Sequence, residues 1–332
     1  MNTNTVIKFH EVGEPEVLQY EQEAIKRPKN GEIRIKVEAI GVGFGECLYR
    51  RGWYIQETVL GGSLGNNAVG IVDAIGPDVT NVNVGQKISL IPSFQMNEFT
   101  VYSEYAIVPA FSAAPYFDSL SIEENASIWM QVSTAYGALI HYGNIDHSDT
   151  VLIHPSSGGV GIAAIQTAKK VGARVIATTR NPDKVNSLLD YGADHVIVTS
   201  TESISDGVNR ITKDIGVSLV FNAMTGNVLN ELVEVTKPGG RVIQYGGIGG
   251  EDTPLPFASV IGKGITIQGY TLYELTYEPS NLEKVISFVK EGVESGIYTA
   301  NVGRVFDFSD MVNVHKYLEA GDMAGSVVVR VG

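Results

Sequence analysis

The segment HPSSGGVG, at residues 154–161, combines glycines and hydroxyl side chains at a spacing that suits phosphate binding. It lies between an apolar run, TVLI, and a segment typical of a helix, IAAIQTAKK. In such a strand–turn–helix unit, free backbone N–H groups at the start of the helix bind the pyrophosphate of a dinucleotide. Aligned on the pattern G-x-G-x-x-G, Gly158 and Gly161 hold the second and third glycines, and Ser156 stands at the first. The sequence therefore predicts a dinucleotide-binding turn, to which Ser156 and Ser157 add hydroxyl donors.

The end of the second predicted strand, in ARVIATTRNPDK, indicates which dinucleotide binds. An NAD-binding fold commonly has an acidic residue there, about 20 positions after the glycines, which holds the ribose 2′-hydroxyl. Here that place falls on Thr179, followed by Arg180, with Lys184 one helical turn later. Guanidinium and ammonium groups suit a 2′-phosphate. We therefore expect NADPH, with solvated surface charge as the alternative interpretation of the two basic residues.

Two other kinds of catalytic site are disfavoured. GGSLG, at 61–65, fits the nucleophile elbow G-x-S-x-G, but the sequence predicts a strand after it where that elbow requires a helix. The six histidines show no compact ligand spacing, and the single cysteine, Cys47, cannot anchor a thiolate metal site alone. We expect no metal, so hydroxyl groups or backbone amides would polarise a substrate. Tyr54 and Thr134 are candidates, with packing as the alternative role for any one of the 15 tyrosines.

Composition favours a small-molecule partner. The chain has 332 residues, 44% hydrophobic and 18% charged, with a net charge of −13. This length is typical of two domains, and the negative charge disfavours nucleic acid as a partner. No apolar segment approaches the about 20 residues that span a bilayer, and the first residues lack the pattern of a secretory signal. We expect a cytoplasmic protein without a membrane or nucleic-acid partner.

Two patterns divide the chain into elements. In the first hundred residues, β-rich runs such as GEIRIKVEAIGV alternate with turn residues, which predicts an antiparallel barrel or sandwich. Near residue 121 the pattern changes, and Ser121 and Glu124 predict a capping box at the start of a helix. Alternating apolar strands and helices then predict a parallel, doubly wound sheet. Two helices, around 279–294 and 309–320, and a strand in GSVVVRV follow.

These segments together resemble the zinc-independent medium-chain dehydrogenase/reductase superfamily, within it the quinone oxidoreductase and enoyl reductase branch. The resemblance is carried by VEAIGVGFGECLYRRGWY (37–54), LGNNAVGIVDAIGPDVTNVNVGQKI (64–88), QVSTAYGAL (131–139) and SSGGVGIAAIQTAKKVGARVIATTR (156–180). It implies an α/β fold: a Rossmann doubly wound parallel sheet plus a GroES-like β-barrel catalytic domain. The implied bounds are 1–124 and 265–332 for the GroES-like domain and 125–264 for the Rossmann NADP-binding domain. A homodimer formed by extending the Rossmann sheet is implied as well.

The resemblance also implies roles for single residues. The tyrosine that serves as proton donor in some enoyl reductases falls on Tyr54, and Glu46 either orients the substrate or faces solvent. The implied catalytic residues are Tyr54, Thr134 and Glu46. The implied cofactor-binding residues are Thr134, Ser157, Gly158, Gly159, Val160, Gly161, Thr179, Arg180, Lys184, Asn222, Tyr245 and Gly246.

Several positions depart from the pattern of that branch. Gly43 and Asn66 stand where zinc enzymes of the superfamily carry Cys and His ligands, which implies that the metal is lost. The quinone reductase branch often has Asn at Gly43, Asp at Glu46 and Glu at Asn67. The family often has Asp where Asn222 stands. These departures predict an atypical substrate pocket.

The resulting hypothesis is an NADPH-dependent reductase that transfers hydride to a quinone or an α,β-unsaturated carbonyl compound without metal. The negative oxygen formed on an enone would need donors, which Tyr54, Thr134 or backbone amides supply, with a proton from Tyr54 or water. Two alternatives remain open at this point. One is a zinc-free alcohol or aldehyde oxidoreductase, and the other is a non-catalytic NADPH-binding sensor or structural protein.

Overall fold

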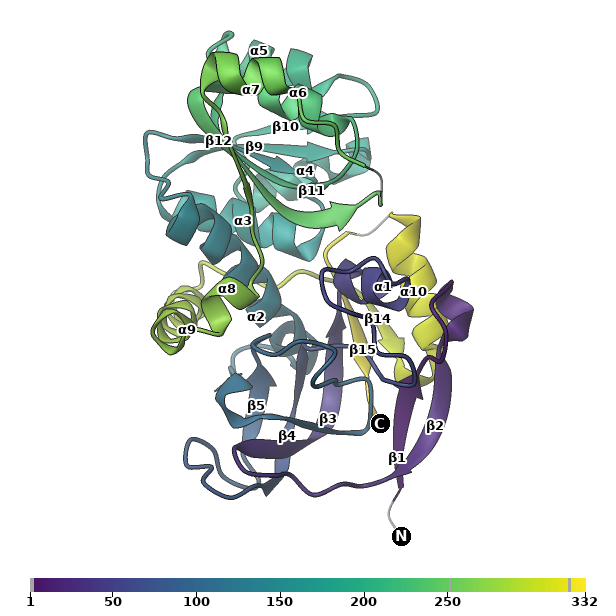
Figure 1. Cartoon of the computed structure of the whole chain (residues 1–332). Coiled ribbons are helices and arrows are strands. Elements are labelled where there is room, and N and C mark those ends of the chain that lie inside the picture. Colours follow the sequence, from purple (N-terminus) through teal and green to yellow (C-terminus); the bar gives the residue numbers. More distant parts are fainter. Residues whose placement is uncertain (1–2, 251, 322–323) are drawn as a thin grey trace. The chain divides into compact units, whose positions relative to one another are not determined.

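The computed structural model describes residues 3–250, 252–321 and 324–332, and the chain divides into two compact units (Figure 1). Unit 1 comprises Met1–Met130, Leu275–Lys290 and Thr299–Gly332. Unit 2 comprises Gln131–Glu274 and Glu291–Tyr298. Compared with the bounds expected from the sequence, unit 2 begins six residues later than 125 and its main segment continues ten residues beyond 264. No helix in the described ranges is both long and apolar enough to cross a bilayer.

Unit 1 is built on an antiparallel sheet in the order β14-β15-β3-β4-β5-β7, in which only β14 and β15 pair in parallel, and β6 also pairs with β3. Its strands are β1 (Thr3–Lys8), β2 (Gln19–Ala24), β3 (Glu32–Val42), β4 (Ala68–Ile75), β5 (Lys87–Leu90), β6 (Tyr105–Pro109), β7 (Ala113–Pro115), β14 (Val302–Asp307) and β15 (Ser326–Arg330). Its helices are α1 (Phe44–Arg50) and α10 (Met311–Ala320), with short 3₁₀ turns η1 (Pro15–Val17), η2 (Ala110–Ser112) and η5 (Phe308–Asp310). β1 and β2 form a separate two-stranded sheet.

The core of unit 1 follows from alternation along its strands. In β3, Ile33, Ile35 and Val37 are almost fully buried, whereas the residues between them are more exposed. Alternate side chains of a strand point to opposite faces, so this pattern places one face of β3 in the core. The antiparallel arrangement expected from the sequence is confirmed.

Unit 2 is built on a six-stranded parallel sheet in the order β10-β9-β8-β11-β12-β13. Its strands are β8 (Thr150–His154), β9 (Arg174–Thr179), β10 (His195–Val198), β11 (Val217–Met224), β12 (Thr236–Ile248) and β13 (Thr266–Gly269). Its helices are α3 (Gly159–Lys170), α4 (Val185–Asp190), α5 (Ile204–Thr212), α6 (Val228–Glu234) and α7 (Phe257–Lys263), with a 3₁₀ turn η4 (Pro182–Lys184). Helices α3 and α4 cover one face, and α5, α6 and α7 cover the other (Figure 1). This is the strand order of the Rossmann fold.

Three of the described helices belong partly to each unit: α2 (Ile122–Ala135), α8 (Tyr273–Thr276) and α9 (Pro279–Glu294). The capping box at the start of α2 is confirmed, because the Ser121 backbone N–H donates to Glu124 at 2.7 Å and the Glu124 N–H donates to the Ser121 hydroxyl at 3.2 Å. The segment IEENASIWMQVSTAYGALIHYG, at 122–143, predicts one continuous helix. The structure instead changes to a π-helix, η3 (Tyr136–Tyr142), whose wider turn shows in the bond from the Gly143 N–H to the Ala138 carbonyl five residues earlier, at 2.8 Å.

The carboxyl ends of the parallel strands lie along one edge of the unit 2 sheet. In open α/β sheets, ligands bind outside this edge, where the strand order reverses. Here the order reverses between β8 and β11, because β9 and β10 extend the sheet on one side of β8 and later strands extend it on the other. The turn after β8 is therefore the first place to examine for a site.

Candidate functional site

The glycine turn of unit 2 joins β8 to α3, as the sequence predicts. Ser156 is fully buried, and its hydroxyl donates to the Ile153 carbonyl at 2.7 Å and accepts from the Thr178 N–H at 2.9 Å. The Ser156 N–H donates to the Thr178 carbonyl at 3.0 Å. The expectation that Ser156 offers its hydroxyl to a phosphate is therefore wrong, because its one proton is used within the protein. Ser156 ties the turn to β9.

Gly161 shows why the last glycine of the pattern is required. A Cβ at this position would lie 2.5 Å from the Ser156 carbonyl oxygen and 2.6 Å from its Cα, which is closer than Cβ atoms approach backbone. Gly158 precedes α3 in an extended conformation, and Gly159 and Val160 begin the helix. The turn thus leaves backbone N–H groups of the first helical turn available to a ligand.

The end of β9 lies beside this turn. The Ser157 hydroxyl donates to the Thr179 hydroxyl at 3.0 Å, which joins two of the predicted cofactor-binding residues. Arg180 follows and is exposed, and Lys184 is half-buried at the end of η4. The structure therefore brings together the glycine turn and the start of the basic segment.

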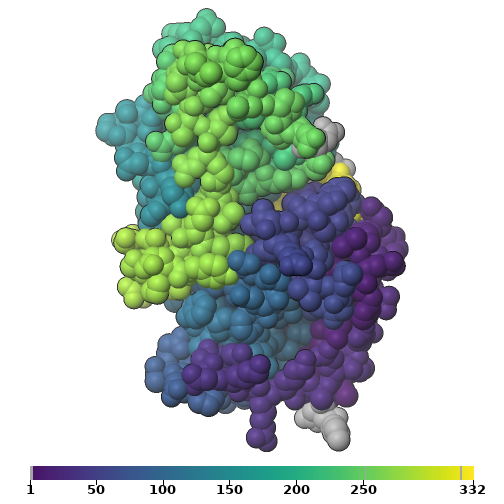
Figure 2. Space-filling model, in the orientation of Figure 1, coloured from purple at the N-terminus to yellow at the C-terminus, as the bar shows by residue number. Residues whose placement is uncertain are grey.

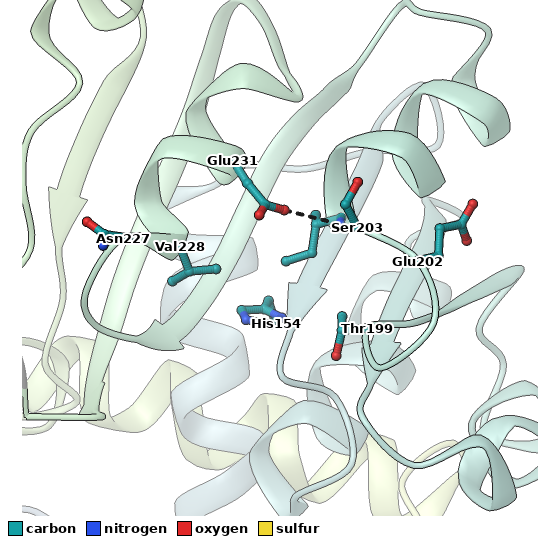
Figure 3. A pocket seen from close by; sticks show the side chains of 8 residues that line it. His154, Thr199, Glu202, Ser203, Asn227, Val228 and Glu231 are labelled. Atoms are coloured by element: carbon teal, nitrogen blue, oxygen red, sulfur yellow. Dashed lines mark hydrogen bonds between the residues drawn. The ribbon is translucent and has the colours of Figure 1, made fainter.

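A cavity of about 320 Å³ opens at the same edge of the sheet. Figure 3 shows the His154 side chain between Val228 and Thr199, with Glu231 above His154 in this view. The residues that line the cavity are His154, Thr199, Glu202, Ser203, Ile204, Asn227, Val228 and Glu231. They come from the ends of β8 and β10 and from the starts of α5 and α6.

The electrostatics of this cavity disfavour an anion. Burial lowers the pKa of His154 to about 4, so its ring is neutral at physiological pH, and the ring bonds to the Thr178 hydroxyl at 2.8 Å. A hydrogen bond from Arg210 lowers the pKa of Glu202, which keeps this carboxylate charged. Glu231 accepts from the Ile204 N–H at 3.2 Å (Figure 3). A neutral histidine and two carboxyl groups suit an uncharged, hydrogen-bonding ring better than a phosphate.

Three other predicted cofactor-binding residues have roles in packing. The fully buried Asn222 amide donates to the Met224 carbonyl at 2.7 Å and to Gln244 at 2.6 Å, and its oxygen accepts from the Met224 N–H at 3.1 Å. Tyr245 stacks on Phe221 with ring centroids 4.0 Å apart, and burial raises its pKa. A Cβ at Gly246 would lie 3.0 Å from the Ala223 Cβ. These residues hold β11 against β12, and a cofactor contact at each stays a prediction.

Thr134 is 8% exposed and lies in the last turn of α2, within unit 2. The other two predicted catalytic residues, Glu46 and Tyr54, belong to unit 1. The structure therefore distributes the predicted catalytic residues over both units.

Glu46 is 3% exposed, so the alternative in which it faces solvent is wrong. Its Oε2 accepts from the Gly43 backbone N–H at 3.1 Å, which caps the start of α1. Burial raises the pKa of the carboxyl to about 7 from its ordinary 4.5. Glu46 is thus a buried acid that changes charge in the physiological range.

Tyr54 packs against the start of the same helix. A Cβ at Gly45 would lie 3.3 Å from the Tyr54 ring and 3.5 Å from its hydroxyl oxygen. The Tyr54 ring also meets the Tyr49 ring edge to face, with centroids 6.4 Å apart. The loop that contains Tyr54 lies at the surface (Figure 2), and its neighbours Trp53 and Ile55 are 61% and 66% exposed.

Replacing Glu46 by glutamine is expected to change how stability depends on pH. In the wild-type protein, the contribution of Glu46 to stability should fall as pH rises from about 4.5 to about 7, because the unfolded chain releases this proton first. The full cost of the shift is about 3 kcal/mol. Glutamine keeps an oxygen for the Gly43 N–H but carries no charge, so Glu46→Gln should gain up to about 3 kcal/mol relative to wild type between about pH 4 and about pH 8. Urea unfolding at both pH values measures this difference, and an equal difference at both would contradict it.

Within residues 3–250, 252–321 and 324–332, no three His, Cys, Asp or Glu side chains gather as metal ligands do.

Two residues that line the cavity, His154 and Glu231, were not singled out in the sequence by their residue types or spacing. His154 is the last residue of β8, and its position at the carboxyl end of a predicted parallel strand is the signal that could have identified it. Glu231 lies within α6, so only the folded arrangement places it at the cavity.

Two family models match the chain: "Alcohol dehydrogenase GroES-like domain" over residues 29–116 and "Zinc-binding dehydrogenase" over residues 159–291. The first match lies in unit 1 and the second covers most of unit 2. The chain therefore pairs a GroES-like domain with a Rossmann-type domain, as the resemblance implies.

Comparisons of the whole chain with known proteins agree with the two family models. A quinone oxidoreductase from Salmonella typhimurium is 29% identical over 97% of this chain and 98% of its own length. A 2-haloacrylate reductase from a Burkholderia species is 25% identical over 97% of this chain and 97% of its own length. The crystal structure of Escherichia coli quinone oxidoreductase complexed with NADPH has a TM-score of 0.91 at 26% identity, over 98% of this chain and 99% of that one. The chain belongs to the medium-chain dehydrogenase/reductase superfamily.

Proposed function

We propose that the protein is an NADPH-dependent reductase that transfers hydride to a quinone or an α,β-unsaturated carbonyl compound without a bound metal. The observation that carries the proposal is the turn at Ser156–Gly161, which has no room for a Cβ at Gly161 and presents the start of α3 at the reversal of strand order. The names of the relatives, a quinone oxidoreductase and a 2-haloacrylate reductase, support the reaction class.

The residues present fit NADPH. The first turn of α3 would hold the pyrophosphate, and Arg180 and Lys184 would hold the 2′-phosphate. The cavity beside His154 suits the uncharged adenine ring. The E. coli quinone oxidoreductase structure is a complex with NADPH, which supports this choice of cofactor.

When bound, NADPH supplies the hydride. The chain's own residues must then stabilise the negative charge that forms on the substrate oxygen. Hydrogen-bond donors stabilise this charge most effectively when the fold already holds them pointing at that oxygen. Tyr54 offers a phenol hydroxyl, and its ring is held against Gly45 and Tyr49. Thr134 is a second candidate donor.

Replacing Arg180 by alanine should weaken NADPH binding about 10-fold to 100-fold, since a charge-assisted hydrogen bond to phosphate contributes about 1.5–3 kcal/mol. NADH lacks the 2′-phosphate, so its affinity should not change. Fluorescence titration with both nucleotides measures the effect. Arg27→Ala, at an exposed arginine of unit 1, is the matched control and should leave both affinities unchanged. Equal losses for NADPH and NADH would show that Arg180 does not contact the 2′-phosphate.

A screen of NADPH consumption against quinones, enones, enals, simple ketones and aldehydes tests the reaction class. We expect consumption with conjugated carbonyl compounds. Consumption with simple ketones or aldehydes alone would favour an alcohol or aldehyde oxidoreductase. Tight NADPH binding with no consumption would favour a sensor.

The homodimer and the cytoplasmic location stay predictions. In a homodimer formed by extending the sheet, a second copy would pair with β13, which lies at one end of the unit 2 strand order.

A further inference from the structure

The loop that carries Tyr54 buries few of its side chains. Residues 53–60 follow α1, and we refer to them as the Tyr54 loop. Trp53 and Ile55 are exposed, and Tyr54 between them is half-buried. A loop with few buried apolar contacts moves unless specific bonds hold it. The position of the Tyr54 hydroxyl therefore depends on the contacts that this loop makes with the rest of unit 1.

Tyr49, in the last turn of α1, contacts the Tyr54 loop near both of its ends. Its ring meets the Tyr54 ring edge to face, with centroids 6.4 Å apart. Its hydroxyl accepts from the Val59 N–H at 3.0 Å, and its backbone carbonyl accepts from the Thr58 hydroxyl at 2.9 Å. One residue of the helix thus joins the start of the loop to its end.

Tyr49 is itself fixed in the core of unit 1. It is fully buried, and its ring meets the ring of Phe9, also fully buried, with centroids 6.0 Å apart. The chain just beyond the Tyr54 loop pairs with the same Phe9. The Gly61 N–H donates to the Phe9 carbonyl at 2.8 Å, and the Phe9 N–H donates to the Gly62 carbonyl at 3.2 Å. Tyr49 therefore connects the loop to the core.

The helix also brings Gly45 to the same ring. Residues four apart lie on one face of a helix, so Gly45 and Tyr49 are neighbours on the surface of α1. A Cβ at Gly45 would lie 3.3 Å from the Tyr54 ring and 3.5 Å from its hydroxyl oxygen. The Tyr54 ring thus lies against two adjacent positions of α1, which together set where its hydroxyl points.

We propose that Tyr49 is a positioning residue, which holds the Tyr54 hydroxyl where it donates to the negative oxygen of the substrate. A donor in an active site must be held within about 0.5 Å of its productive place, and contacts of its neighbours provide that hold. The Tyr49 side chain has no exposed surface, so it acts through Tyr54 rather than on the substrate. This inference rests on the proposed function and adds a residue outside the predicted site.

Tyr49→Phe tests the role of the hydroxyl, because it removes the acceptor for the Val59 N–H and keeps the ring. With saturating NADPH and 1,4-naphthoquinone, kcat should fall about 3-fold to 10-fold, which corresponds to one lost hydrogen bond. The loss is partial because Gln56, whose Oε1 accepts from the Met96 N–H at 3.0 Å, still holds the middle of the loop. NADPH affinity should not change. An unchanged kcat would overturn the proposal.

A double-mutant cycle with Tyr54→Phe separates positioning from general destabilisation. Adding Tyr49→Phe to Tyr54→Phe should change kcat by less than about twofold, because the hydroxyl to be positioned is already absent. Equal fold losses in the two backgrounds would overturn the proposal and leave Tyr49 a structural role only. Tyr102→Phe is the matched control, because Tyr102 is a fully buried tyrosine of the same core that bonds to His315 Nε2 at 3.2 Å. This control should keep the wild-type kcat.

Amide hydrogen exchange measures the hold on the loop without turnover. Tyr49→Phe should speed exchange of the Val59 N–H about 3-fold to 10-fold, because this N–H loses its acceptor. The Trp53 N–H, which donates to the Leu48 carbonyl at 2.9 Å, should exchange as in wild type. Unchanged exchange at Val59 would overturn the proposal.

The outcomes distinguish this inference from the proposed function. If no acceptor is reduced, the proposed function fails, and the exchange rates still decide whether Tyr49 holds the loop. If quinones are reduced but Tyr54→Phe turns over like wild type, the proposed function stands and the positioning role is overturned.

Discussion

Replacing Gly161 by alanine is expected to reduce NADPH affinity at least tenfold. The added Cβ would lie 2.5 Å from the Ser156 carbonyl oxygen, and Ser156 cannot move away because three bonds hold it to Ile153 and Thr178. The start of α3 must shift instead, which turns its N–H groups from the pyrophosphate. Overpacking of this kind costs about 1–3 kcal/mol. Fluorescence titration with NADPH and urea unfolding measure both effects.

Gly262→Ala is the matched control. Gly262 lies within α7, and a Cβ there would meet no atom within 4 Å. This variant should bind NADPH like wild type and be as stable or slightly more so, since alanine favours helix. If Gly161→Ala binds NADPH as well as Gly262→Ala does, the turn after β8 is not where the pyrophosphate binds.

Replacing Tyr54 by phenylalanine has the second large expected effect. The hydroxyl is the proposed donor to the negative oxygen, and removing one such donor typically costs about 100-fold to 1,000-fold in turnover. The ring contacts with Gly45 and Tyr49 remain, so the fold should persist. NADPH affinity should not change, because the predicted cofactor-binding residues all lie in unit 2.

Steady-state kinetics with a saturating quinone, together with NADPH titration, measures this prediction. Tyr105→Phe, on β6 of the same unit, removes a hydroxyl elsewhere and should keep wild-type turnover. Unchanged turnover in Tyr54→Phe would remove this residue from the mechanism. A loss of NADPH affinity would show that its role is structural.

Much of the fold could be predicted from local patterns. The capping box of Ser121 and Glu124 depends on residues three apart, and both of its bonds form. The stop after α3 depends on Gly172, whose φ of +84° glycine adopts easily. The change from α-helix to π-helix at Tyr136–Tyr142 could not be predicted, because apolar periodicity does not distinguish the two over so short a segment.

The candidate site was predictable only in part. Gly161 has a steric role that any dinucleotide turn imposes, so its spacing alone indicated this role. The role of Ser156 depends on Thr178, which is 22 residues away, and the sequence pattern carries no sign of that pairing. The burial of Glu46 likewise depends on how α1 packs against distant segments such as Tyr102. Long-range packing therefore decides which polar side chains remain available to a ligand.

The most direct test of the central claim is an anaerobic assay, with a metal chelator present, that counts NADPH oxidised against quinone reduced. The account predicts one NADPH consumed per quinone reduced, at a rate that the chelator does not change, with NADPH strongly preferred over NADH. NADPH that binds but is never oxidised by any conjugated carbonyl compound, or turnover that the chelator abolishes, would contradict it.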